Sequence, residues 1–277
     1  IEVALYCAMA TRTIDQRNTD QSMVKPAALI DVVELTPLKL IDRRCFNLLL
    51  ANAWETVSEN REHSIKKSDL LVNTKATDQI DKSIGRLMAS RVKVKIIRDG
   101  EDYVRSFPFL EYIDDPIRSD GLVYYKFPEK LRELVQDSTV FARLQKDVMF
   151  ALSSKYALAL YEMIQRRGNL DKMFKETFPL NQIRSLLGVE KTKLKDYKNF
   201  RSRALLPAVQ EVDFLSDYHV EFTVTKRIKT VQSVTLAWHK KSHEEIKEAF
   251  RELRGSSLGR KERMTRKVEV VSPRRSA

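Results

Sequence analysis

The chain has 277 residues and a net charge of +12, and its sequence pI of about 9.6 favours an acidic partner such as nucleic acid. Apolar residues make up 43% of the chain, with only 7 glycines and 8 prolines, which excludes collagen-like and low-complexity proteins and leaves one large or two small globular domains. Two cysteines, Cys7 and Cys45, predict neither a disulfide framework nor a metal cluster. No apolar run approaches the roughly 20 residues that span a bilayer, so we expect a cytoplasmic protein that does not bind membranes.

The first half predicts an arm followed by helices and a hairpin. Residues 1–22 keep no sustained period and predict a flexible arm. Thr36-Pro37 is typical of a helix start. Val92, Val94 and Ile96 alternate with lysines before an Asp99-Gly100 turn, the pattern of a hairpin. The other segments that we expect are a short helix over 64–73, a helix over 77–90, strands over 103–112 and 121–127, and a helix over 128–136.

The second half repeats this order. Ser153-Ser154 caps a predicted helix over 155–167, which ends at Gly168-Asn169. A second helix is expected over 180–187. After a third, basic helix, alternating residues predict a hairpin from Val220 to Trp238 that turns at 226–229, and then a helix over 242–253.

The stretch from Leu194 to Val212 predicts a helix with one apolar face and one cationic face. At about 100° per residue, one face collects Tyr197, Phe200, Ala204, Ala208 and Val212. The opposite face and its flanks collect Lys195, Lys198, Asn199, Arg201, Ser202 and Arg203. Such side chains neutralise phosphates and offer hydrogen bonds to base edges in a major groove, although a merely solvated basic face has the same pattern. Pro207 is expected to kink this helix or to end its straight part.

The positive charge is confined to the second half. Residues 1–136 hold 21 Lys+Arg and 21 Asp+Glu, whereas residues 137–277 hold 29 and 17, so the second half carries the whole excess of +12. A membrane surface also attracts such charge, but the basic helix lacks the broad aliphatic face of an interfacial anchor. Residues 254–277 predict a disordered basic tail that adds nonspecific DNA affinity or only solubility.

Three helices and a hairpin in each half are the order of a winged helix. The predicted fold class is therefore α+β, with two tandem winged-helix domains. We expect an arm over 1–22, an N-terminal winged helix over 23–137, a C-terminal winged helix over 138–241, and a C-terminal helix with a basic tail over 242–277.

A family resemblance agrees with this interpretation. Its residues are Leu35-Thr36-Pro37-Leu38, Phe46-Asn47-Leu48-Leu49-Leu50-Ala51, the run from Ser153 to Glu162 that ends in Tyr-Ala-Leu-Ala-Leu-Tyr-Glu, Pro179-Leu180, Leu186-Leu187-Gly188-Val189, Tyr197-Lys198-Asn199-Phe200 and Leu206-Pro207-Ala208. In combination they resemble the iteron-binding replication initiators of bacterial plasmids, over roughly Met23 to His239. Arg227-Ile228-Lys229 stands where many relatives have a glycine, so the resemblance does not fix the turn type of the wing.

The resemblance implies function as well as fold. It implies monomers bound to direct repeats of double-stranded DNA, the iterons, at a plasmid origin. It implies dimers, formed through the first winged helix, that bind an inverted repeat, repress the initiator's own promoter and so contribute to plasmid copy control. It also implies recruitment of the host replication initiator and the replicative helicase. Neither a cofactor nor a metal is expected.

The candidate DNA contacts fall into three groups. The main reader is the basic helix, with Lys195, Lys198, Asn199, Ser202 and Arg203, and with Arg201 at its flank. The wing offers Lys226, Arg227 and Lys229 to phosphates, unless this turn is simply solvated. The first half offers the weaker candidates Lys75, Lys82 and Arg86. Because that half has no net charge, we expect its DNA contact to contribute less and assign no base readout there, and an ordinary solvent-exposed helix face has the same pattern.

Three other functions remain as alternatives. A transcriptional repressor without an initiator role would need the same DNA contacts. A DNA-processing enzyme would need a metal-binding histidine cluster, but of the four histidines only His239 and His243 are close, without a carboxylate motif. A tyrosine recombinase would need a late tyrosine, and the last one, Tyr218, is followed at once by His219. Since no glycine-rich phosphate loop is present either, we expect no catalysis.

Overall fold

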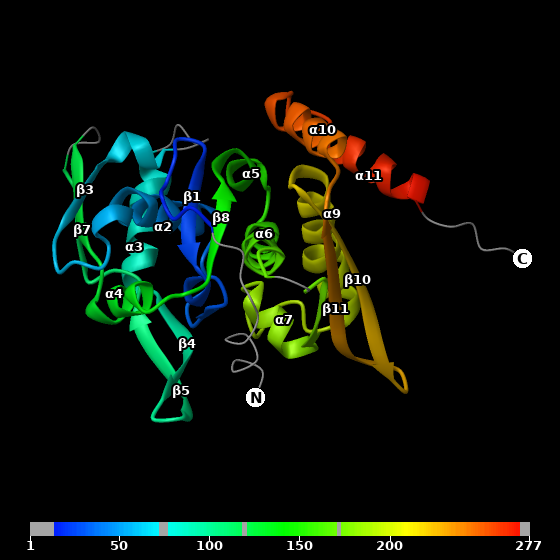
Figure 1. Cartoon of the computed structure of the whole chain (residues 1–277), viewed down its shortest axis with the longest axis horizontal. Coiled ribbons are helices and arrows are strands. Elements are labelled where there is room, and N and C mark those ends of the chain that lie inside the picture. Colours follow the sequence, from blue (N-terminus) through cyan, green and yellow to red (C-terminus); the bar gives the residue numbers. More distant parts are fainter. Residues whose placement is uncertain (1–13, 72–76, 118–120, 171–172, 272–277) are drawn as a thin grey trace, which may run out of the picture.

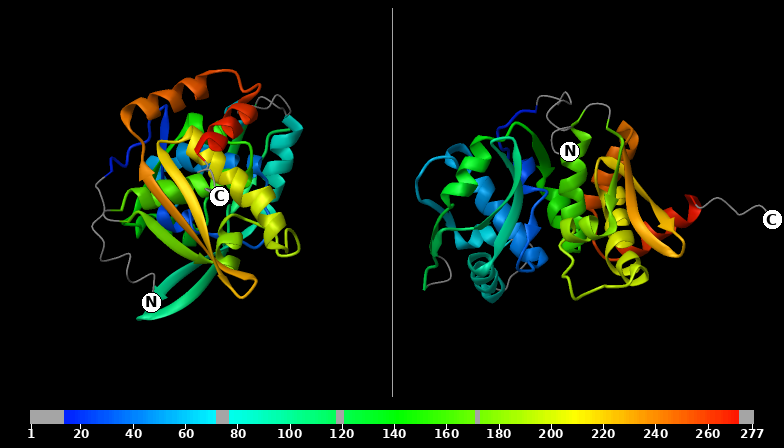
Figure 2. Two further views of the ribbon diagram at one scale, coloured as in Figure 1. Left: turned by 90° about the vertical axis from the view of Figure 1, so that its right-hand side faces the viewer. Right: turned by 90° about the horizontal axis from the view of Figure 1, so that it is seen from below.

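The structure is a computed structural model that describes residues 14–71, 77–117, 121–170 and 173–271, with side chains for all of these except 77 and 266–271. It has two lobes side by side (Figure 1), the first blue to green and the second green to red, with the β1–β8 sheet and helix α6 between them. The C-terminal helices α10 and α11 pack over the outer side of the second lobe (Figures 1 and 2).

Among the described residues, the first lobe is built from three α-helices and small antiparallel sheets. Its elements are β1 (Ser22–Pro26), η1 (Ala27–Leu29), β2 (Val33–Glu34), α2 (Leu40–Ala53), η2 (Trp54–Thr56), β3 (His63–Lys66), η3 (Lys67–Leu70), α3 (Thr77–Ala89), β4 (Arg91–Arg98), β5 (Glu101–Pro108), β6 (Tyr112–Asp114), β7 (Leu122–Lys126) and α4 (Glu129–Gln136).

The second lobe repeats the plan and adds two helices. Its elements are β8 (Phe141–Gln145), α5 (Lys146–Ala151), α6 (Lys155–Gly168), β9 (Lys175–Pro179), α7 (Leu180–Leu186), α8 (Tyr197–Phe200), the π-helical turn η4 (Arg201–Leu205), α9 (Leu206–Leu215), β10 (Tyr218–Arg227), β11 (Thr230–Lys240), α10 (His243–Arg254) and α11 (Arg260–Val271).

Each lobe has a hairpin joined by a third strand. The antiparallel sheets are ordered β2-β4-β5 in the first lobe and β10-β11-β9 in the second, and a further sheet is ordered β3-β7-β6. In the first lobe the hairpin directly follows the amphipathic helix α3, and in the second it directly follows the basic helix α8–α9. The predicted α+β class with two winged helices is confirmed.

The sheet formed by β1 and β8 joins the two lobes. Ser22 pairs with Gln145 and Pro26 with Phe141, and Met23, Val24, Ala142 and Leu144 are fully buried. The sequence predicted neither strand. The residues just before β1, expected to be a free arm, are held as well, because Asn18 Nδ2 donates to the Ala51 carbonyl over 3.0 Å. Residues 1–13 lie outside the described part.

Two predicted helix positions in the first lobe are wrong. Helix α2 begins at Leu40 rather than at Thr36-Pro37, because the Asp42 carboxylate accepts the Lys39 backbone N–H over 2.8 Å and so caps the helix there. The helix expected over 64–73 is instead strand β3, which pairs with β7, followed by one 3-10 turn.

The basic helix is also shifted toward the C-terminus and less regular than predicted. It begins at Tyr197 and runs to Leu215, with a π-helical turn at its centre. Pro207 lacks the N–H that would close an α-turn on the carbonyl of residue 203, and its ring crowds that carbonyl. The backbone therefore widens over Arg201–Leu205 and continues beyond Pro207.

The C-terminal segment is helical where a disordered tail was predicted. Helix α11 covers Arg260–Val271, and its Met264 is buried. Glu252 of α10 accepts hydrogen bonds from Arg260 over 3.1 Å and from Arg263 over 3.0 Å. The basic residues of the tail's first turn are thus held by a carboxylate of α10, which local composition did not reveal.

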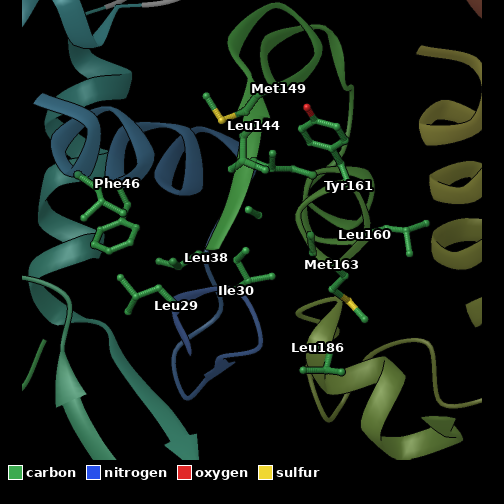
Figure 3. Packing of buried hydrophobic residues seen from close by; sticks show 14 of the residues in the cluster. Leu29, Ile30, Leu38, Phe46, Leu144, Met149, Leu160, Tyr161, Met163 and Leu186 are labelled. Atoms are coloured by element: carbon green, nitrogen blue, oxygen red, sulfur yellow. The ribbon is translucent and has the colours of Figure 1, made fainter. Parts of the chain in front are cut away.

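A single apolar core runs through both lobes. Phe46 and Leu38 of the first lobe connect through Leu144 of β8 with Leu160 and Met163 of α6 in the second (Figure 3). Ser154 caps α6 by accepting the Ala157 N–H, as the sequence predicted. Because α6 is buried on nearly all sides, it serves both lobes as a common wall.

Candidate nucleic-acid interface

The apolar face of the basic helix anchors it in the second lobe. Phe200, Ala204, Ala208 and Val212 are completely buried, as the helical spacing predicted. Phe200 also packs under the Arg184 guanidinium of α7, 5.2 Å from the ring centroid. This anchoring leaves the opposite, cationic face of the helix toward solvent.

The cations of that face are exposed. Lys198 and Arg203 project from the helix, whereas Lys195 lies in the loop before its first turn. Among the ion pairs of the described residues, none involves these three side chains. They are therefore available to phosphates or base edges, and binding to DNA would break no salt bridge within the protein.

The polar side chains between these cations have weak internal contacts. Asn199 Nδ2 donates to Asp196 over 3.5 Å, and the Ser202 hydroxyl donates to the Asn199 carbonyl over 3.4 Å. Both distances lie at the long limit for a hydrogen bond, so a base edge can replace either contact at little cost. An Asn side chain offers adenine a donor and an acceptor together.

Two arginines, Arg201 and Arg184, hold the segments next to this cationic face in place. Arg201 stacks over the Phe222 ring of β10, 5.9 Å from its centroid, and so joins the helix to the wing. Arg184 donates to the backbone carbonyls of Lys193 and Leu194, which holds the loop before α8. Leu194 adopts a left-handed φ of 50° in that loop.

The wing of the second lobe carries its cations at an exposed tip. Arg227 pairs with Thr230, so Ile228 and Lys229 form a two-residue turn. Ile228 takes a φ of 59°, a conformation that normally favours glycine. Its side chain is 94% exposed. Lys226, Arg227 and Lys229 are exposed too, as expected for phosphate contacts from a wing.

The first-lobe candidates have three different outcomes. Lys82 is exposed on α3, as predicted. Lys75 lies outside the described residues. Arg86 does not project outward as we expected: its guanidinium forms two hydrogen bonds to the completely buried Asp42 of α2, over 2.7 and 2.6 Å. Without Arg86 the Asp42 carboxylate would be left in the core with no cation to pair with. Arg86 is therefore a structural residue that joins α3 to α2.

Sequence reasoning missed a cationic stripe on the first wing. Arg91, Lys93 and Lys95 are exposed at alternate positions of β4, whereas Val92 and Val94 between them are buried. The alternation was visible, but the net charge of zero over the first half concealed it. The tips of both hairpins, β4–β5 and β10–β11, project from the same side of the molecule, the lower side in Figure 1 and in the left view of Figure 2.

A groove of about 1200 Å³ separates the first wing from α7. Lys93 and Lys95 line one wall, and the amides Asn181 and Gln182 line the other. Three acidic residues also line it, Asp31, Asp137 and Glu176. Asp31 and Glu176 are paired with Arg167 over 2.9 and 2.5 Å. The groove therefore presents lysines and neutral amides beside carboxylates that are mostly paired, a lining that suits a phosphodiester backbone.

Comparison with known proteins places this surface in a family. Residues 22–165 match the family model described as Initiator Replication protein, WH1, and residues 179–238 match the one described as Initiator Rep protein, WH2. The chain belongs to the family of initiator replication proteins. Its two winged helices are thus the DNA-binding domains of a replication initiator.

Other comparisons add little. The structure of domains 2 and 3 of RctB aligns with 11% sequence identity and a TM-score of 0.44, covering 83% of this chain and 95% of that one. No curated protein matches the sequence. Helices α10 and α11 follow residues 179–238, the segment that the second family model matches.

Within the described residues, no group of three or more His, Cys, Asp or Glu side chains is arranged to hold a metal ion. Within the same residues, none of the helices combines the length and the apolar character that crossing a membrane requires.

Proposed function

We propose that this initiator starts plasmid replication by binding direct repeats at the origin as a monomer. As a dimer it binds an inverted repeat, represses its own promoter and so limits copy number. The observation that supports this most is the set of unpaired cations Lys195, Lys198 and Arg203 on the basic helix, next to the cationic wing. A major groove accepts such a helix, and the flanking phosphates accept the wing.

The first lobe supplies a second, weaker contact in this proposal. Its wing carries Arg91, Lys93 and Lys95 and projects from the same side of the molecule as the second wing. Two contacts on one duplex make a long recognition sequence, as an origin repeat requires. Because phosphate contacts carry no sequence information, the first lobe adds affinity and register, and the basic helix adds most of the base preference.

The first lobe also supports self-association. Strand β5 is an edge strand in the β2-β4-β5 sheet, and within the described residues no strand pairs with its outer edge. Its Tyr103 and Val104 are 47% and 61% exposed. Because an exposed apolar edge strand favours pairing with another chain, this strand suits a dimer contact between first lobes.

The remaining parts of the proposal rest on the sequence and on the family resemblance. The chain acts in the bacterial cytoplasm, recruits the host replication initiator and the replicative helicase to the origin, and catalyses no reaction itself. Incubation of supercoiled origin plasmid with the protein and Mg²⁺ tests the last point. Formation of nicked or relaxed plasmid by the protein itself would contradict this part of the proposal and identify a DNA-processing enzyme.

Selection of bound duplexes from a random pool, at two salt concentrations, tests the main proposal. We expect one long motif covering two adjacent major grooves, retained at the higher salt, and its halves as an inverted pair when dimers are selected. Recovery of unrelated duplexes would refute sequence-specific binding by this surface.

A second experiment distinguishes the initiator from a repressor without an initiator role. A plasmid that carries the selected repeats but no other origin is introduced with the gene supplied in trans. Stable maintenance is expected. Repression of a reporter without maintenance of the plasmid would favour the repressor.

A further inference from the structure

Three polar side chains form a closed buried group where the two lobes meet. Lys25 of β1 donates to Asn47 of α2 and to Glu162 of α6, each over 2.9 Å, and Asn47 Nδ2 donates to the second Glu162 oxygen over 2.8 Å. Each residue thus contacts both others. Their residue exposures are 5%, 0% and 2%, so water contributes almost nothing to the group. We name it the junction triad.

The triad connects two of the sequence runs that carry the family resemblance. Asn47 belongs to Phe46-Asn47-Leu48-Leu49 on α2, and Glu162 ends the Tyr-Ala-Leu-Ala-Leu-Tyr-Glu run on α6. None of the three side chains lies on the DNA-binding helix or on a wing. The neighbouring Tyr161 likewise reaches the junction, where its hydroxyl accepts the Gln145 backbone N–H of β8 over 2.8 Å.

Stability alone is a poor explanation for such a group. A buried ion pair loses the hydration of both charges, and apolar residues of similar size are often as stabilising or more so. Hydrogen bonds, unlike apolar contacts, depend strongly on distance and angle. Apolar contacts therefore tolerate a small rotation of one lobe against the other, whereas three mutual hydrogen bonds of 2.8–2.9 Å do not. The surrounding core is apolar and continuous across the junction (Figure 3).

We infer that the junction triad fixes the angle between the two lobes and thereby sets the spacing of the two DNA segments that one chain contacts. Lys25, Asn47 and Glu162 are then positioning residues for DNA recognition. This inference rests on the proposed function, in which both lobes bind one duplex. One added base pair moves the second segment by about 3.4 Å and turns it by about 34°, so a rigid pair of lobes rejects it.

The test compares two matched substitutions. Glu162→Gln removes the negative charge of the triad while keeping the side chain's shape. Asp42→Asn makes the same change at another buried carboxylate, whose ion pair with the partly exposed Arg86 lies wholly inside the first lobe. Both variants are expected to lose stability, so stability itself does not distinguish them. The probes are the duplex selected by the unmodified chain and the same duplex with one base pair inserted between its two contacted segments.

The unmodified chain is expected to prefer the original duplex by roughly tenfold or more, the range of one poorly fitted position in a DNA site. With Glu162→Gln the ratio of the affinities for the two duplexes is expected to fall below about threefold. With Asp42→Asn the ratio is expected to stay as it is in the unmodified chain. If Glu162→Gln keeps the full preference, the triad does not set the spacing and the inference is overturned. Should Glu162→Gln fail to fold, Lys25→Met with Glu162→Met removes both charges together and is judged by the same criterion.

A distance measurement separates failure of this inference from failure of the proposed function. Spin labels on unnatural amino acids at the exposed positions Gln136 and Glu244 report the separation of the two lobes without DNA. A narrow distribution that broadens with Glu162→Gln, but not with Asp42→Asn, supports the triad even if no specific duplex is selected. Equal widths in all three proteins would contradict it even if DNA binding is sequence-specific.

Discussion

Gly168 at the end of α6 lies where any side chain would strike Tyr218. A Cβ at this position would lie 2.6 Å from Tyr218 Cε1 and closer still to Cζ and the hydroxyl oxygen. Tyr218 is buried in β10, and its backbone N–H donates to the Ser216 hydroxyl over 3.2 Å. The ring therefore has little room to retreat. The sequence suggested only a helix stop at Gly168, whereas the structure shows that it permits close approach of a helix and a strand.

Two opposing effects set the result of Gly168→Ala. Overpacking of a core costs about 1–3 kcal/mol, and the better helix propensity of alanine returns less than about 1 kcal/mol at a helix end. We expect a net loss of about 1–2 kcal/mol in the free energy of unfolding. Gly85→Ala is the control, because Gly85 lies inside α3 and an added Cβ would meet no atom within 4 Å beyond the neighbouring backbone of its own helix. That variant is expected to gain about 1 kcal/mol.

Urea unfolding followed by circular dichroism measures both variants. A double-mutant cycle with Tyr218→Ala then isolates the clash: in that background Gly168→Ala is expected to be neutral or to stabilise by less than about 1 kcal/mol, a coupling of about 1–3 kcal/mol. If Gly168→Ala stabilises the protein as Gly85→Ala does, or if its cost persists without the Tyr218 ring, the explanation by close approach is wrong.

Three further predictions concern DNA binding and pH. Lys198→Ala should weaken binding to the selected duplex by about 1–3 kcal/mol and relax the base preference at one position. Fluorescence anisotropy with single-base variants of the duplex measures both effects. An equal loss of affinity for every duplex would show that Lys198 contacts a phosphate and not a base. Lys229→Ala should weaken all duplexes alike and lower the slope of log affinity against log salt by about one, and an unchanged slope would remove the wing tip from the interface. Hydrogen bonds from Ser242 and His219 lower the pKa of Glu245 from 4.5 to about 2. The stabilisation from its ionised form is therefore complete above pH 4.5 and is lost as the pH falls toward 2. Hydrogen exchange at the start of α10 should become less sensitive to acid in Glu245→Gln, and an unchanged pH profile would exclude this carboxylate as the cause.

Elements whose pattern is local could be predicted from the sequence. Helix α3, helix α6 and the two wing hairpins follow from their own periodicity and turn residues. Strand β3 could not, because its extended form depends on pairing with β7, nearly sixty residues later: Ser64 opposes Tyr124. A short polar segment with helical spacing carries no sign of such a distant partner.

The same limit applies to the candidate site. Lys198 and Arg203 are exposed as their helical positions predicted, since the apolar face of their own helix determines where they project. Arg86 has an equally polar position on α3, but Asp42 lies 44 residues earlier and turns its side chain inward. The exposed lysines of β4 were missed for the opposite reason, because nearby acidic residues cancel their charge in a count over the whole half.

The pairing of β1 with β8 has a consequence for synthesis of the protein. Domains usually fold as units in the order in which the ribosome makes them. Here the strand that begins the first lobe, Ser22–Pro26, pairs with Phe141–Gln145, which begins the second. A nascent chain that ends before Phe141 leaves Met23 and Val24, both fully buried in the finished protein, without their partner strand. The first lobe therefore completes its fold only when the opening of the second lobe has been translated, and the two lobes mature together.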